Sequence, residues 1–212
     1  MGRLADLDAV TLDVNGTLVG LVDPVPKLDR LLRQHGIERR AAAIRQAVEA
    51  EGVVYRARAL EAHEPVPFAT MQRECTGVFL AEVGADGVDP EEFAPGYVGA
   101  MEFEVLPGIS ESLAFLHSCG LELAVVANFD LTLTDRLDQL GLTRAFTTVV
   151  TPAEAGAAKP DPAIFELALG RLGVRPERAL HIGDGETDEA GARAAGMHFE
   201  WAPVPEALER WS

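Results

Sequence analysis

The sequence predicts an α/β protein with a doubly wound parallel sheet and an inserted, all-helical domain. Two observations predict this class: short apolar runs alternate with helical patterns along most of the chain, and one long stretch carries helical patterns alone. Connections between successive parallel strands are right-handed, so helices are expected on both faces of the sheet. The 212 residues allow one such domain with a smaller insert, but not two full independent domains.

Five apolar runs have the character of buried strands. The first covers residues 9–12 and ends at Asp13, shortly before the turn-forming pair Asn15-Gly16. Glycines follow several of the helical patterns, as is usual where a helix ends. The other expected strands cover 121–127, 146–151, 179–183 and 197–202, and the helices that accompany them cover 109–119 and 131–140 or begin at 161 and near 187.

Residues 21–103 form the predicted insert. Val25 and Leu28 share one apolar helical face with two further leucines, and a second such face follows later in this stretch. An insert after the first strand of a parallel sheet is expected over the carboxyl ends of the strands, where open α/β sheets bind ligands. We therefore expect a core domain of residues 1–20 and 104–212, and a helical cap that acts as a lid.

The composition limits the partners and the compartment. The chain has 34 acidic and 18 basic residues, a formal charge of −16, and such a surface repels nucleic acid and anionic membranes. Its two cysteines show no disulfide or metal-binding spacing, and no signal core or membrane span is visible. We expect a cytoplasmic monomer or homodimer that takes a small-molecule substrate and binds neither nucleic acid nor membranes.

Polar clusters follow the ends of several predicted strands. Because the carboxyl ends of parallel strands meet at one edge of a sheet, these clusters are expected to converge on one crevice. A single aspartate after a strand is most often a turn or capping residue, but several clusters at strand ends are harder to explain in that way. The clusters are Asp13 with Asn15, Asn128, Lys159, and Asp184 with Glu186 and Asp188.

The residue types of these clusters indicate the chemistry. A carboxylate at a strand end can act as a nucleophile. Several carboxylates in one crevice repel each other, and a hard cation such as Mg²⁺ relieves that repulsion. Lys159 can neutralise both the nucleophile and a transferring phosphoryl group. Gly16 allows close approach of the backbone, whose N–H groups can hold an anion.

Four segments resemble, in family order, the motifs of the haloacid dehalogenase superfamily. Residues 13–17 are similar to its Asp-x-Asp-Gly-Thr motif, and 126–130 to its second motif, in which Ser or Thr is followed by Asn. Residues 159–165 resemble the Lys-Pro-x-Pro motif, and 183–196 the Gly-Asp-x-x-x-Asp motif. The insert resembles the family's helical type-one cap. The resemblance implies a hydrolase with a Rossmann-like core.

The resemblance also implies roles for individual residues. Asp13 is expected to attack phosphorus and form an aspartyl-phosphate intermediate, with Lys159 as the second catalytic residue. The expected Mg²⁺ ligands are Asp13, the backbone carbonyl of Asn15, Asp184 and Asp188, and the expected phosphate-binding positions are Gly16, Thr17, Ala127 and Asn128.

Two positions depart from the family pattern. The family's phosphatases have a second Asp where this chain has Asn15, and that carboxyl protonates the leaving oxygen and then activates water. Loss of such acid–base help typically costs ~10²–10⁴ in rate. Ala127 replaces a phosphate-binding hydroxyl, and one lost hydrogen bond costs about 0.5–1.5 kcal/mol. Activity on ordinary phosphate esters is therefore expected to be weakened.

Three functions remain open at this point. The first is a Mg²⁺-dependent phosphohydrolase that acts on a small phosphorylated metabolite with a good leaving group. The second is a non-catalytic or regulatory binding protein on the same fold. The third is a 2-haloacid dehalogenase-like hydrolase, because halide leaves without a proton, although that branch needs no metal and Asp184 and Asp188 keep a metal-binding pattern.

Overall fold

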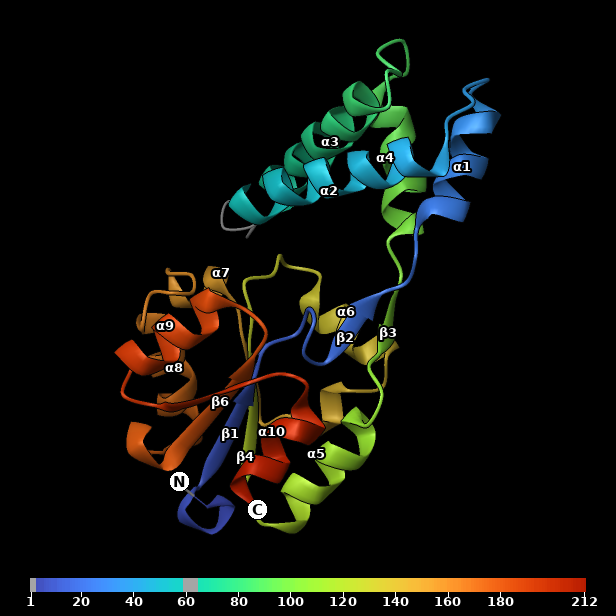
Figure 1. Cartoon of the computed structure of the whole chain (residues 1–212). Helices are drawn as coiled ribbons and strands as arrows, with labels where there is room; N and C mark the ends of the chain where they lie inside the picture. Colours follow the sequence, from blue (N-terminus) through green and yellow to red (C-terminus); the bar gives the residue numbers. More distant parts are fainter. Residues whose placement is uncertain (1–2, 59–64) are drawn as a thin grey trace. The chain divides into compact units, whose positions relative to one another are not determined.

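The chain forms two compact units, one of Met1–Gly20 with Glu104–Ser212 and one of Leu21–Phe103 (Figure 1). The computed structural model describes residues 3–58 and 65–212, so residues 1–2 of the predicted core and 59–64 of the predicted insert lie outside the described residues.

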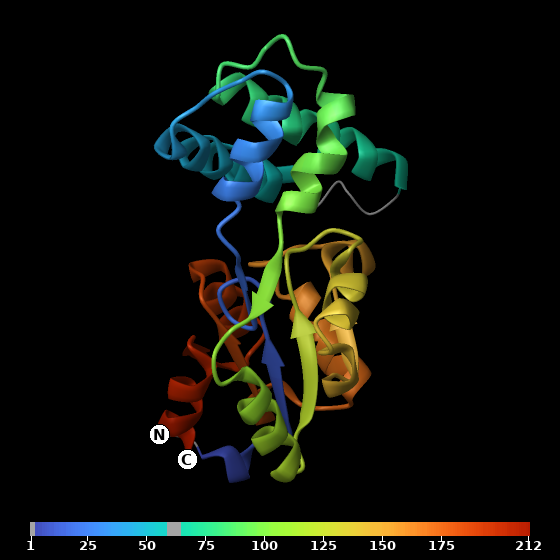
Figure 2. The same ribbon diagram turned by 90° about the vertical axis from the view of Figure 1, so that its right-hand side faces the viewer.

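The first unit is built on a five-stranded sheet with the strand order β5-β4-β1-β6-β7. All four neighbouring pairs are parallel, and Figure 2 shows β1 (blue) and β4 (yellow-green) side by side. β1 lies at the centre of the sheet, and all of its residues are buried. The strands are β1 Ala9–Leu12, β4 Glu122–Val126, β5 Thr148–Val150, β6 Ala179–Gly183 and β7 His198–Trp201.

Helices cover both faces of this sheet. Helices α8 and α9 pack on one face, and α5 and α10 lie on the other (Figure 1). The predicted class, a doubly wound α/β core with a parallel sheet, is thereby confirmed. The helices are α5 Ile109–Ser118, α6 Leu133–Gln139, α7 Pro152–Ala155, α8 Ala163–Leu172, α9 Glu186–Ala194 and α10 Val204–Trp211, with 3₁₀ turns at Leu4–Asp6, Thr143–Ala145 and Pro176–Arg178.

The face under α8 and α9 carries an apolar core. Ile164 and Phe165 of α8 are fully buried against Val126 and Val150 of the neighbouring strands. Burial of each side chain of this size stabilises the folded state by about 1.5–3 kcal/mol. The carboxyl ends of β4, β1 and β6, which carry the predicted site, are therefore fixed by a packed interior.

The described part of the second unit is a bundle of four α-helices. Apolar side chains from all four helices form its core, with Leu28, Ile44, Phe79 and Phe93 fully or almost fully buried. The helices are α1 Val25–Gln34, α2 Ala41–Arg58, α3 Pro65–Glu82 and α4 Pro90–Ala100.

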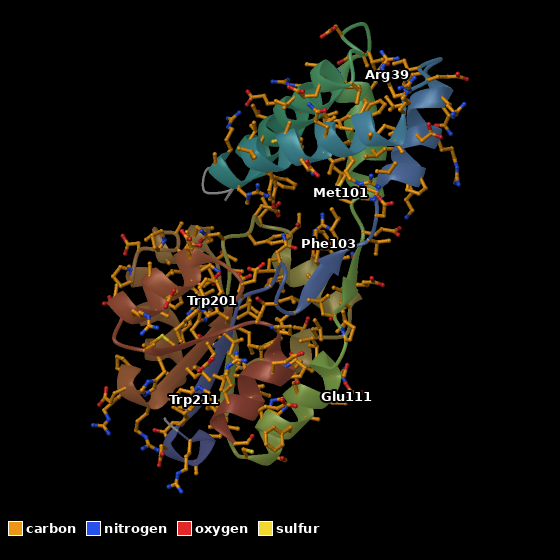
Figure 3. The ribbon with its side chains drawn as sticks, viewed as in Figure 1. Arg39, Met101, Phe103, Glu111, Trp201 and Trp211 are labelled. Atoms are coloured by element: carbon orange, nitrogen blue, oxygen red, sulfur yellow. The ribbon has the colours of Figure 1, made fainter. Side chains whose placement is uncertain are left out.

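The guanidinium of Arg39, labelled in Figure 3, binds the backbone at the carboxyl end of α3. It donates hydrogen bonds to the carbonyl oxygens of Val83 and Gly84, which follow the helix. A cation at this end also complements the helix dipole.

Glu51 of α2 is a carboxyl group buried in this helical unit. Burial is the largest cause of its raised pKa, so the folded chain binds its proton more tightly than the unfolded chain does. Stability is therefore lost as pH rises from the ordinary glutamate pKa of about 4.3 through the raised value. We expect Glu51→Gln to raise the thermal unfolding temperature at pH 7 and to leave it nearly unchanged at pH 4. Equal effects at both pH values would contradict this.

A two-stranded sheet pairs β2 Val19–Leu21 with β3 Phe103–Val105. The sequence did not predict these strands, because three residues are too few to show an alternating pattern. None of the helices in the described part of the chain is both long and apolar enough to cross a membrane.

Candidate active site

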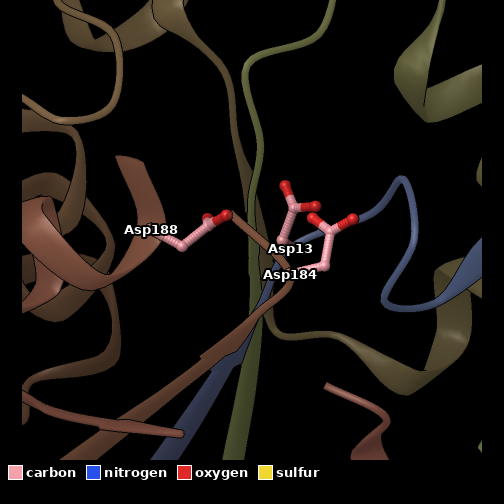
Figure 4. Close-up of side chains that lie close together, drawn as sticks. All are labelled: Asp13, Asp184 and Asp188. Carbon is pink, nitrogen blue, oxygen red and sulfur yellow. The ribbon is translucent and has the colours of Figure 1, made fainter. Parts of the chain in front are cut away.

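The strand ends bring most of the predicted site residues together. Asp13 follows β1, Asp184 follows β6, and Asp188 lies in the first turn of α9. One carboxylate oxygen from each lies within 4.8 Å of the others, and Figure 4 shows the three side chains gathered at this edge of the sheet. The neighbouring positions of β1 and β6 explain the convergence, since the carboxyl ends of parallel strands share one edge.

The ammonium group of Lys159 contacts both Asp13 and Asp188, and the side chain is almost fully buried. Its ammonium group donates to Asp13, to Asp188 Oδ1 at 2.6 Å and to the carbonyl oxygen of Val126 at 3.1 Å. Burial alone would lower the pKa of Lys159, but the charges of the two carboxylates outweigh it and raise the pKa. The lysine is therefore a fixed positive charge beside Asp13.

The carboxylate of Asp188 is engaged on both oxygens. Oδ1 accepts from Lys159 and from His181 Nε2 at 3.0 Å, and Oδ2 accepts from the backbone N–H of Gly185 at 3.1 Å. Burial would raise the pKa of Asp188, but the hydrogen bond from His181 and the charge of Lys159 lower it to about 2. Asp188 is therefore ionised, and its oxygens are held by donors within the protein.

The pKa values of Asp13 and Asp184 are both raised. Burial raises the pKa of Asp13, the nearby Asp188 raises it further, and Lys159 opposes both. Partial desolvation raises the pKa of Asp184, and the charges of Asp13 and Asp188 add to this. Three carboxylates face one ammonium group, so the cluster favours a further cation.

The donor set fits a hard divalent cation. Mg²⁺ prefers oxygen ligands, and one carboxylate oxygen from each of the three aspartates lies within 4.8 Å of the other two. The Asn15 side chain is exposed, and among the described residues no backbone N–H donates to its carbonyl oxygen. Gly16 has φ +77°, and a Cβ atom there would lie 2.0 Å from Asp184 Oδ2, so only glycine lets this loop approach the carboxylate.

The predicted phosphate-binding positions have different surroundings. Asn128 lies after β4 and forms two hydrogen bonds with the backbone of Lys159. Asn128 Nδ2 donates to the carbonyl oxygen of Lys159 at 2.9 Å, and the N–H of Lys159 donates to Asn128 Oδ1 at 2.8 Å. Its amide thus fixes the lysine loop. Ala127 is buried, and its N–H donates to Val150 at 3.2 Å. Thr17 is buried, and in the described part of the chain its hydroxyl has no hydrogen-bond partner.

The sequence analysis did not place Thr11 and His181 in the site. They are paired in register on β1 and β6, both are fully buried, and Thr11 Oγ1 lies 2.7 Å from His181 Nδ1. The available signal was a single polar residue within each of two otherwise apolar strands. This signal is weak, because a histidine in a strand most often packs in the core without a role at a site.

Comparisons with known proteins find matches that cover nearly the whole chain. The family model described as haloacid dehalogenase-like hydrolase matches residues 7–196. Haloacid dehalogenase-like hydrolase domain-containing protein 3 of Bos taurus is 33% identical over 222 residues, covering 99% of this chain and 87% of that protein. Glyceraldehyde 3-phosphate phosphatase of Methanopyrus kandleri is 31% identical over 199 residues, covering 90% and 82%.

The fold is also found among solved structures. The HAD-hydrolase YfnB of Bacillus subtilis has a TM-score of 0.73 at 20% identity, covering 92% of this chain and 88% of that chain. The motif order, the family match and the full-length relatives together show that the chain belongs to the haloacid dehalogenase-like hydrolase family.

Proposed function

We propose that the chain is a Mg²⁺-dependent phosphohydrolase that acts on a small phosphorylated metabolite, with Asp13 as the nucleophile. The observation that carries this proposal is the buried Asp13 carboxylate, bonded to Lys159 and within 4.8 Å of the carboxylate oxygens of Asp184 and Asp188. A glyceraldehyde 3-phosphate phosphatase and a phosphoglycolate phosphatase, each 31% identical over about nine tenths of this chain, support a small phosphorylated substrate.

In the first step, a carboxylate oxygen of Asp13 attacks the phosphorus atom. The bond between phosphorus and the leaving oxygen breaks, and an aspartyl phosphate forms. Lys159 stabilises the charge on the phosphoryl oxygens, as a fixed cation beside the nucleophile does. Mg²⁺ held by Asp13, Asp184 and the carbonyl of Asn15 would neutralise charge on the same oxygens.

In the second step, water attacks the phosphorus atom, and the bond to Asp13 breaks. Phosphate is released, and the carboxylate is restored. The amide of Asn15 can neither protonate the leaving oxygen nor accept a proton from water, so both protons must be exchanged with solvent. The preferred substrates are therefore those with good leaving groups, such as acyl and aryl phosphates.

The remaining predicted residues receive supporting roles in this proposal. Asp188 already accepts three hydrogen bonds, so we assign it to positioning Lys159 and to contact with Mg²⁺ through water. We assign the backbone at Gly16, Thr17 and the segment of Ala127 and Asn128 to the phosphate-binding side. Among the described residues the hydroxyl of Thr17 has no hydrogen-bond partner. Residues 21–103 act as the cap that selects the substrate, and the protein works in the cytoplasm as a monomer or homodimer.

The test is release of phosphate from an acyl or aryl phosphate. We expect turnover with Mg²⁺, loss of turnover with a chelator, and background rates for Asp13→Asn, which keeps the shape of the side chain but removes the nucleophile. Asp135→Asn, an exposed change on α6, is the matched control. Halide release from a 2-haloacid without metal, or binding of phosphorylated metabolites with no turnover, would contradict the proposal.

A further inference from the structure

A chain of buried hydrogen bonds runs behind the proposed site. Thr11 and His181 have no exposed surface, and their side chains meet at 2.7 Å between neighbouring strands. The other ring nitrogen of His181, Nε2, lies 3.0 Å from Asp188 Oδ1. The edge of the Phe165 ring packs against the imidazole, with ring centroids 4.9 Å apart. Polar groups in such an interior are costly to leave unpaired, so each partner matters.

The chemistry of the partners fixes the direction of these bonds. Asp188 Oδ1 already accepts from the ammonium group of Lys159, so it acts as an acceptor here, and His181 Nε2 must carry a hydrogen and donate it. In the neutral ring Nδ1 is then an acceptor, and the hydroxyl of Thr11 donates to it. The hydroxyl therefore selects the Nε2–H tautomer and the orientation of the ring.

The bonds continue from Asp188 back to β1. Asp188 Oδ1 also accepts from Lys159, and Lys159 donates in turn to Asp13. Asp13 lies two residues after Thr11, and side chains two apart on a strand share a face. The chain of bonds thus begins in β1 at Thr11 and ends at Asp13, directly after this strand, and each member holds the next against movement.

We propose that Thr11 and His181 are positioning residues that orient Asp188 and, through it, hold Lys159 against the nucleophile Asp13. The inference rests on the proposed function, because it gives Lys159 and Asp13 their catalytic roles. Neither residue touches the substrate, since both are buried behind the carboxylates. Their loss should lower kcat more than it raises KM.

The test compares conservative and non-conservative variants in the full-length chain. Mutation of residues that orient the groups of a site typically lowers activity by about 10–100-fold, so we expect His181→Leu to lower kcat by about that factor. His181→Gln, whose Nε2 amide can still donate, should recover much of the loss. Thr11→Val should lower kcat while Thr11→Ser keeps it. His198→Leu, a change of an exposed histidine on β7, is the matched control and should keep kcat.

A second measurement does not depend on activity. Imidazole ¹⁵N NMR of the metal-free protein should show His181 as the Nε2–H tautomer, and Thr11→Val should shift its signals. An Nδ1–H tautomer, a glutamine variant no better than leucine, or a loss confined to KM would overturn the inference. If the wild type releases no phosphate, the proposed function fails, and the NMR result alone decides whether Thr11 orients the ring. If His181→Leu does not fold, the comparison of kcat between Thr11→Val and Thr11→Ser tests the inference instead.

Discussion

Asn15→Asp is expected to raise the turnover number for an alkyl phosphate at least tenfold, and by as much as ~10²–10⁴. The new carboxyl group could protonate the leaving oxygen in the first step and activate water in the second, which the amide cannot do. The Asn15 side chain is exposed beside the glycine loop, so the change places little new charge in the interior. Steady-state kinetics at saturating Mg²⁺ would measure the gain.

The size of the gain should depend on the leaving group. An alkyl phosphate expels a basic oxygen that needs a proton, whereas an aryl phosphate expels a weakly basic one, so the gain should be larger for the alkyl substrate. Asn15→Ala is the control, because it keeps the backbone carbonyl proposed to bind Mg²⁺ but supplies no acid. An equal gain in Asn15→Ala, or no gain in Asn15→Asp with the metal bound, would refute the role assigned to position 15.

The centre of the sheet could be predicted from the sequence because β1 and β6 are mostly apolar and buried throughout. β1 and β6 are recognised from short apolar runs that end at Asp13 and Asp184, and their parallel pairing follows from the alternation with helices. By contrast, β2 and β3 have only three residues each, and the final helix α10 follows β7 with no clear change of pattern. Short elements give too little periodicity to be recognised.

The candidate site was predictable to the extent that it depends on strand ends. Convergence of strand ends explains why Asp13 and Asp184 meet, whereas Lys159 reaches them from the loop between α7 and α8. Convergence also does not give the direction of individual hydrogen bonds. Both polar atoms of the Asn128 side chain bond to the backbone of Lys159, a contact that depends on the path of the loop before α8. His181 depends in the same way on strand register, which places Thr11 opposite it. Register and loop path are properties of the folded chain.

Lys159→Met is expected to lower the free energy of unfolding by about 3–5 kcal/mol in metal-free buffer. The change removes the ammonium group and leaves Asp13 and Asp188 buried without it. The methionine fills a similar volume, so lost charge, rather than a cavity, would dominate the effect. Denaturant unfolding at neutral pH would measure the loss. Lys27→Met, which removes the exposed ion pair with Glu102, is the control and should have little effect.

Three further measurements separate charge from packing. Without Lys159 the pKa values of both carboxyl groups should rise, so the variant should regain stability as pH falls and the carboxylates become protonated. Adding Asp13→Asn to Lys159→Met should recover part of the lost stability, because one of the two unpaired charges is removed. Mg²⁺ should stabilise Lys159→Met more than the wild type if the carboxylates bind it. A loss that is independent of pH, of Asp13→Asn and of Mg²⁺ would show that Lys159 acts through packing alone, and the electrostatic basis of the site would then be wrong.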